Sequence, residues 1–118
     1  AATGGDGTLP CTGEVLLLGL ATCAGGTYRS IATATEIPLR YGFVYSEGDL
    51  DYRGTLGVDR AAPVGFKNIR LRFELDSDAT TEDIATLQKL TERYCVVYQT
   101  LASGVKPEVE FHNRVDAG

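Results

Sequence analysis

Two cysteines far apart in the chain are the residues with the most reactive chemistry. Cys23 ends the apolar run VLLLGLATC, and Cys95 follows an amphipathic stretch in the second half of the chain. A cysteine reacts as its thiolate, and burial disfavours the thiolate unless a cation, a helix N-terminus or a hydrogen-bond donor stabilises it. Free cysteine is also among the most buried residue types. The residues alone therefore leave open whether Cys23 is a reactive thiol or a small core residue.

The two cysteines would form a redox pair if the fold brought them together. A disulfide requires Cα atoms within roughly 4.4–6.8 Å of each other. Oxidation of Cys23 to a sulfenic acid would then allow Cys95 to condense with it. Cys11 lies in a segment rich in glycine and proline and is interpreted as incidental. His112 has no acid–base partner that the sequence identifies, so it is predicted to be a surface or core histidine.

Composition narrows the classes of partner and site. The chain has 118 residues and a net charge of −5, and its basic residues are scattered, so no nucleic-acid surface is predicted. One histidine and three dispersed cysteines do not form a zinc site, and we expect neither a metal nor a cofactor. No apolar run reaches the roughly 18 residues of a membrane span. The odd cysteine count, with no secretory signal, favours the reducing cytoplasm.

Hydrophobic periodicity predicts a single α+β domain over residues 1–118, with mostly antiparallel pairing. Residues 1–10 are predicted to be a flexible lead-in. A turn-rich loop separates the first two strands, and a loop of that length is more often functional or partner-facing than idle. The predicted elements are a helix over 12–37, strands over 39–46 and 68–76, a helical region over 78–104 and a last strand over 105–113.

The first predicted helix is apolar on every side, which is typical of a helix that is buried on every side. In so small a domain, either a sheet wraps this helix or a partner subunit shares it. Gly19, Gly25 and Gly26 weaken it by roughly 1 kcal/mol each relative to alanine. These glycines have two explanations that the sequence leaves open, namely tight helix–helix packing and access for a substrate.

Three segments resemble the OsmC/Ohr family, in its OsmC-like branch, over about residues 9–110. PCTGEVLLLGLATC is similar to the start of that family's central helix, which carries its first cysteine. GDLDYRGTLGVD and VGFKNIRLRFEL resemble its strand–turn–strand section. ATTEDIATLQKLTERYCVVYQTL resembles its second helix, with the second cysteine. Each motif is moderately specific, and their order and spacing carry the resemblance.

The resemblance implies an OsmC-like fold, with an antiparallel sheet around buried central helices, in an intertwined homodimer with active sites at the interface. It implies a thiol-dependent peroxidase that reduces small organic hydroperoxides. Cys23 then matches the peroxidatic position and Cys95 the resolving position, while Glu14 matches an acidic residue that positions an arginine. The implied reductant is a dithiol such as dihydrolipoamide, carried by a lipoylated protein.

The chain departs from the family pattern in three places. Val96 stands where a proline usually follows the second cysteine, and Thr12 and Gly13 fill a turn that commonly holds a proline. The family's catalytic arginine comes from strands ahead of the first helix, and here that segment is short and has no Arg or Lys. The N-terminal strands are therefore expected to be short or missing.

The cation that would activate Cys23 is consequently open. Arg29 lies about 120° around an ideal helix from Cys23, so it does not share its face. Arg53 and Arg60, in the long loop, are candidates that would reach the thiol from a partner subunit. The alternative is a dimer of the same fold without peroxidase activity, which binds a small apolar ligand or serves a structural role.

Overall fold

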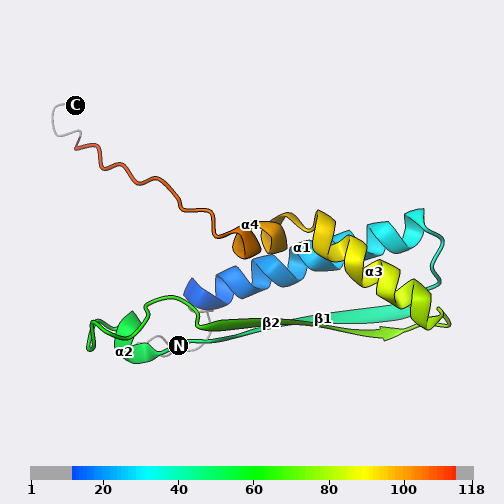
Figure 1. Ribbon diagram of the computed structural model, residues 1–118, viewed down its shortest axis with the longest axis horizontal. Coiled ribbons are helices and arrows are strands. Elements are labelled where there is room, and N and C mark those ends of the chain that lie inside the picture. Colours follow the sequence, from blue (N-terminus) through cyan, green and yellow to red (C-terminus); the bar gives the residue numbers. More distant parts are fainter. Residues whose placement is uncertain (1–11, 114–118) are drawn as a thin grey trace.

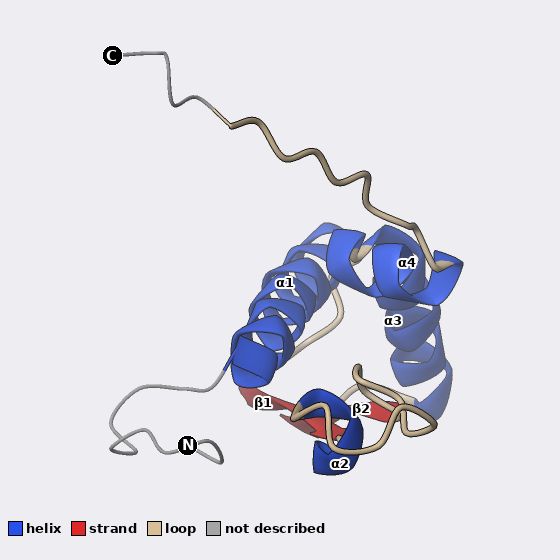
Figure 2. Ribbon diagram, turned by 90° about the vertical axis from the view of Figure 1, so that its left-hand side faces the viewer, coloured by secondary structure: helices blue, strands red, loops and turns tan. Residues whose placement is uncertain are grey.

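The computed structural model describes residues 12–113, so Cys11 and the predicted lead-in over 1–10 lie outside the described residues. Helices cover one face of a two-stranded antiparallel sheet (Figures 1 and 2). This is the mixed α and β architecture that the sequence predicts. The elements in chain order are α1 (Thr12–Ala34), β1 (Tyr41–Asp49), α2 (Tyr52–Thr55), β2 (Asn68–Asp76), α3 (Thr81–Tyr94) and α4 (Val96–Ser103).

The sheet is a long hairpin whose two faces differ in chemistry. β1 and β2 pair over their whole length, from Tyr41 opposite Asp76 to Asp49 opposite Asn68. β2 has the bounds that its strict alternation predicts, because every second side chain of a strand points to the same face. Leu71 and Phe73 of β2 pack against the helices. The opposite face of β2 carries its charged side chains.

The core forms where α1 crosses the sheet and meets α3 and α4. Tyr28 of α1 meets Phe73 edge-on, with ring centroids 5.3 Å apart. Leu87 of α3 joins this cluster, as expected from the amphipathic pattern of that segment. Thr80 caps α3 by accepting a hydrogen bond from the backbone N–H of Asp83 at 3.1 Å, so the helix begins at Thr81, within the helical region predicted from residue 78. A second cluster, nearer the N-terminus of α1, contains Leu20, Ala24 and Cys95.

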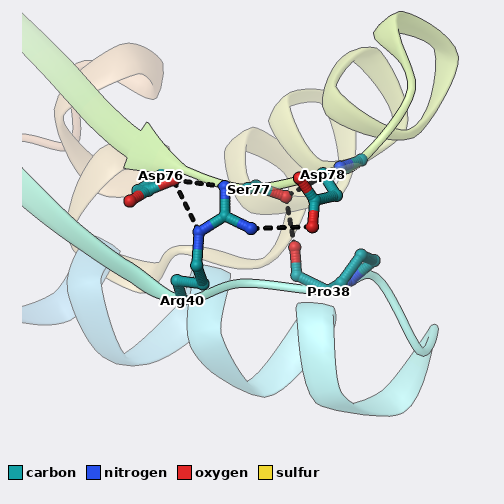
Figure 3. Close-up of polar contacts among 6 residues, drawn as sticks. Pro38, Arg40, Asp76, Ser77 and Asp78 are labelled. Atoms are coloured by element: carbon teal, nitrogen blue, oxygen red, sulfur yellow. Dashed lines mark hydrogen bonds and ion pairs between the residues drawn. The ribbon is translucent and has the colours of Figure 1, made fainter.

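A polar cluster joins the end of β2 to the connection between α1 and β1 (Figure 3). The Arg40 guanidinium donates to Asp76 and to Asp78, the latter at 2.7 Å. The Ser77 hydroxyl donates to the carbonyl of Pro38 and accepts from the N–H of Ala79. Exposed ion pairs contribute little individually. The Ser77 bonds hold the backbone where the chain leaves the sheet for α3.

α1 is less buried than its sequence predicts. Only Leu20, Ala24, Tyr28 and Ala32 of this helix are buried, while Val15 is 56% exposed and Leu18 is 63% exposed. Among the described residues, α1 is the one helix long and apolar enough to cross a membrane by length and composition alone. A core helix passes the same test. The protomer therefore leaves uncovered an apolar face of a helix that was predicted to be covered on every side.

The predicted last strand over 105–113 is wrong for the protomer. Gly104 ends α4 in the left-handed conformation, with φ 68°, as its position predicts. The following residues have no strand partner and run away from the body of the molecule (Figure 1). An isolated extended segment has no backbone partner, so its alternating pattern cannot by itself form a strand. Val109 and Phe111 are 74% and 96% exposed.

Gly42 of β1 provides a test of the core. A Cβ at this position would lie 2.5 Å from the Tyr28 hydroxyl and 2.7 Å from Leu75 Cδ2. We expect Gly42→Ala to lower the free energy of unfolding by about 1–3 kcal/mol, because the packed neighbours must shift.

Urea unfolding followed by circular dichroism measures this change. Gly65→Ala is the matched control, since a Cβ there meets nothing within 4 Å, and it should change the stability by less than about 0.5 kcal/mol. Equal stabilities of the two variants would contradict the packing of Tyr28 against β1.

Candidate functional site

Cys23 and Cys95 lie in contact although α1 and α3 are distant in sequence. Cys23 is near the middle of α1, and Cys95 is the single residue between α3 and α4. The two Sγ atoms are 3.4 Å apart, with the Cys95 thiol in position to donate to Cys23. Both cysteines are free thiols. A short movement of either side chain would bring the sulfur atoms to bonding distance.

The backbone at Cys95 creates this junction. Its extended conformation, φ −74° and ψ 112°, ends α3 and begins α4. The N–H of Cys95 still donates to Thr91 in α3, and its carbonyl already accepts from Gln99 in α4, each at 2.9 Å. Cys95 is therefore both the C-cap of α3 and the N-cap of α4. The first N–H groups of α4 are left without acceptors inside the helix.

The two thiols differ in exposure. Cys95 has no exposed surface and belongs to the core cluster with Leu20 and Ala24. Cys23 packs at the margin of that cluster and is only partly buried. A reagent from solution can therefore reach Cys23 before Cys95.

Hydrogen-bond donors lower the pKa of Cys23. The largest cause is the backbone N–H of Val97 in the first turn of α4, and further donors are the Cys95 thiol, the N–H of Val96 and the Thr27 hydroxyl. Burial opposes them but does not outweigh them. These donors favour the charged form, so Cys23 holds more thiolate at neutral pH than an ordinary cysteine.

Burial raises the pKa of Cys95, and the neighbouring Cys23 adds to the rise. Backbone donors in α4 work in the opposite direction without cancelling the effect of burial. Cys95 thus stays protonated where Cys23 ionises. The pair combines a thiolate that can attack an electrophile with a thiol that can donate a proton and later form a disulfide.

The candidate arginines do not reach Cys23 within the protomer. The Arg29 guanidinium lies over the ring of Tyr28, 5.7 Å from its centroid. Arg53, in α2, is held by Asp51 at 2.7 Å, and this contact lowers the pKa of Asp51 to about 2. None of the groups that shift the pKa of Cys23 is a cation. Supply of Arg53 or Arg60 by a partner subunit stays a prediction.

Glu14 lies apart from the cysteines. It is an exposed residue in the first turn of α1, nine residues before Cys23. Nine residues rotate an ideal helix by about 180°, so the two side chains leave opposite faces. Glu14 instead borders a surface hollow shared with Ser46 and Arg72 of the sheet. Its role beside an arginine of the active site stays a prediction that one protomer does not fulfil.

A cavity of about 570 Å³ lies between the inner face of β2 and the helices α3 and α4. Leu20 and Cys95 form part of its wall, and Leu71, Phe73 and Leu75 line the sheet side. Such a volume and apolar lining are typical of pockets for small organic molecules. Of the two cysteines of the pair, only Cys95 belongs to the lining, and its side chain is buried.

His112 lies on the exposed segment after α4. Its Nε2 contacts the Glu110 carboxylate at 2.8 Å, and both side chains are exposed. It takes no part in the cysteine pair, in agreement with its interpretation as a surface histidine.

A family model described as OsmC-like protein matches residues 5–110. The chain belongs to the OsmC family. The match includes Cys23, Cys95 and Glu14, and it extends over every helix and strand of the structure. A comparison with curated proteins found none that matches this chain.

Solved structures show the same fold at low sequence identity. An OsmC-like protein from Mycoplasma pneumoniae superposes with a TM-score of 0.71 at 21% identity, over 84% of this chain and 68% of that one. An organic hydroperoxide resistance protein OsmC from Legionella pneumophila gives 0.63 at 21% identity, over 83% and 66%. An OsmC-like hydroperoxide resistance protein from Jannaschia gives 0.64 at 18% identity, over 96% and 72%. The chain thus spans about two thirds to three quarters of these relatives.

Sequence reasoning missed the donors of α4. The stretch VVYQTL suggests a further turn or a short helix, but neither its start at Val96 nor its direction follows from the pattern. The signal that could have indicated the break is a change in helical periodicity at Cys95. A break between two helices needs one residue in an extended conformation, and Cys95 stands where one helical pattern ends and the next begins. Thr27 was also missed, although its position one helical turn after Cys23 puts both residues on nearly the same face.

The difference between the two thiols predicts their order of modification. Because donors lower the pKa of Cys23 while burial raises that of Cys95, iodoacetamide should alkylate Cys23 first. The rate at Cys23 should reach half of its maximum below the pH at which an ordinary thiol does, and the rate at Cys95 above it. Peptide mapping by mass spectrometry across a pH series measures each rate separately. Alkylation of Cys95 at the lower pH would contradict the assigned asymmetry.

Proposed function

We propose that this protein is a thiol-dependent peroxidase that reduces organic hydroperoxides, with Cys23 as the peroxidatic and Cys95 as the resolving cysteine. The observation that carries the proposal is the contact of two free thiols at 3.4 Å, one of them favoured as the thiolate and the other as the thiol. A structural pair of core cysteines would need no such difference.

The reaction runs in two steps on the same pair of sulfur atoms. The Cys23 thiolate attacks the distal oxygen of ROOH, the O–O bond breaks, and ROH leaves after a proton is supplied. Cys23 is then a sulfenic acid. The Cys95 sulfur attacks the Cys23 sulfur, a disulfide forms, and water leaves. An external dithiol reduces the disulfide through a mixed disulfide and restores both thiols.

The apolar residues around the cysteine pair support an organic hydroperoxide, rather than hydrogen peroxide, as the substrate. Burying an alkyl group contributes about 25 cal/mol per Å² of apolar surface, and hydrogen peroxide has no such surface to bury. The Legionella and Jannaschia relatives are themselves described as hydroperoxide resistance proteins. A lipoylated protein is the proposed source of the dithiol, and the cytoplasm is the proposed location, because it keeps thiols reduced.

A second candidate function is favoured by the cavity of about 570 Å³. A protein of this fold could bind a small apolar ligand there without redox chemistry. No cation within residues 12–113 is among the groups that shift the pKa of Cys23, which fits that alternative. The two candidates differ in whether peroxide is consumed.

Peroxide consumption decides between them. The reduced protein, supplied with cumene hydroperoxide and dihydrolipoamide, should turn over the peroxide and form a Cys23–Cys95 disulfide seen by mass spectrometry. Cys23→Ser should fall to the background rate, because the nucleophile is gone. Without dihydrolipoamide, which would itself reduce a sulfenic acid, Cys95→Ser should consume about one equivalent and stop as a sulfenic acid, which dimedone traps.

Cys11→Ser is the matched control, since it removes the third thiol and should keep the full rate. If the wild-type protein consumes peroxide no faster than Cys23→Ser, the peroxidase proposal fails and ligand binding remains.

We further propose that the protein works as an intertwined homodimer. Three exposed apolar side chains of α1 support this, namely Val15, Leu16 and Leu18. The segment after α4 supports it as well, because its apolar residues, Val105, Pro107, Val109 and Phe111, alternate with polar ones. Such alternation is typical of a half-buried strand, and a second copy would supply the missing strand partner. Glu14 would enter an active site through the same assembly.

Two neighbouring substitutions test this assembly. Phe111→Asp should shift a dimer towards the monomer mass of 12.6 kDa in light scattering. The reason is that it removes an apolar ring worth roughly 1.5–3 kcal/mol from each half of the interface. His112→Asp adds the same carboxylate on the polar side of the segment and should leave the mass unchanged. A wild-type protein that is monomeric at high concentration would contradict the homodimer.

A further inference from the structure

The family pattern assigns thiolate stabilisation to an arginine, and in the described part of this chain no such residue lies beside Cys23. Cys23 instead packs, as Val97 of α4 does, against the core cluster that contains Cys95. Cys95, whose Sγ is 3.4 Å from that of Cys23, is the first cap of α4. Its side chain makes no capping hydrogen bond to α4. The N-terminal end of this helix therefore faces the pair without a side-chain cap.

We propose that the N-terminus of α4, through the backbone N–H groups of Val97 and Val96, is the element that stabilises the Cys23 thiolate in this protein. The inference rests on the proposed peroxidase function for its catalytic meaning, and its physical content rests on the contact of Cys23 with Cys95, the N-cap of α4, together with the direction of the Cys23 pKa. Val97 and Val96 are positioning residues that act through backbone atoms. Their side chains are not required for this role.

The physical basis is the partial positive charge at the start of a helix. The first N–H groups of a helix have no acceptor within it, and the aligned peptide dipoles add roughly half an elementary charge at this end. Thiolates at helix N-termini are known to be stabilised in this way. α4 has eight residues, or about two turns in all, and its first turn carries the N–H groups that have no acceptor within the helix.

The same donors account for the ionisation of Cys23. The N–H of Val97 is the largest of the causes that lower its pKa, and the N–H of Val96 acts in the same direction. Thr27 can add a weaker donor, although its hydroxyl now bonds to the carbonyl of Cys23 at 2.8 Å. The absence of a proline after Cys95 fits this arrangement, because a proline at position 96 would lack one of the two N–H groups.

A backbone substitution tests the inference without altering a side chain. Residues 95–118 can be synthesised and joined at Cys95 to a recombinant 1–94 thioester, which yields the full chain. In one protein the hydroxy-acid analogue of valine replaces Val97, so that an ester oxygen stands in place of the N–H. In a second protein the same exchange is made at Val96. The control carries the leucine analogue at Leu101, whose N–H in a helix bonds to the carbonyl of Val97.

The measurement is the rate of alkylation of Cys23 by iodoacetamide, followed by peptide mapping from pH 5 to 10. We expect the exchange at Val97 to lower the rate at neutral pH roughly tenfold and to move the pH profile upwards, because a hydrogen bond to a charged group is lost. The exchange at Val96 should have a smaller effect in the same direction. The control should stay within about twofold of the unmodified ligated protein.

Two results would overturn the inference. Equal losses at Val97 and Leu101 would mean that a loosened α4, rather than a lost donor, changes the thiol. Unchanged rates at both Val97 and Val96 would assign the thiolate to another group, such as an arginine of a second copy. Because the assay uses no peroxide, it stands even if the protein consumes none, so failure of the proposed function and failure of this inference remain distinct.

Discussion

The helix break at Cys95 is the constraint on which the rest of the site depends. If α3 continued as a regular helix through residue 95, the N–H groups of Val96 and Val97 would bond to carbonyls of the preceding turn. They would then have nothing to offer Cys23. The extended conformation of one residue frees these donors, turns α4 towards α1 and buries the Cys95 sulfur against Cys23. Backbone geometry at one position thus sets the contact, the burial and the difference in ionisation.

The difference in burial between Cys23 and Cys95 suits the two thiols to different steps of the proposed reaction. A thiolate attacks best when it is exposed and its pKa is near or below the ambient pH, whereas a resolving thiol can wait in the protonated form. Cys23 at the margin of the core and Cys95 within it satisfy these two needs. In the resulting disulfide, the thiol with the lower pKa is the better leaving group. In the proposed cycle, attack on the Cys95 sulfur would release the Cys23 thiolate, but the more exposed Cys23 sulfur is the one that a reductant from solution reaches first.

The sequence predicts what periodicity controls and misses what one dihedral angle controls. The alternation of NIRLRFELD gives the bounds of β2, and the amphipathic stretch before Cys95 gives the buried position of Leu87 in α3. The burial of α1 and the last strand over 105–113 were wrong for the protomer. Both patterns predict contacts that are not made within the described residues of this chain. The donors of α4 are backbone atoms, and no residue type marks them.

Backbone N–H donors and an arginine stabilise a thiolate in ways that depend differently on ionic strength and on position. A cation attracts a thiolate over several ångströms and loses strength as salt screens it, with a Debye length of about 8 Å at physiological ionic strength. Short N–H bonds in a partly buried place are screened far less, but they need the exact position of the helix end. Among the groups that shift the pKa of Cys23, the largest cause is the backbone of α4 and none is a cation. The Cys23 thiolate is therefore expected to depend on the position of α4 more than on ionic strength.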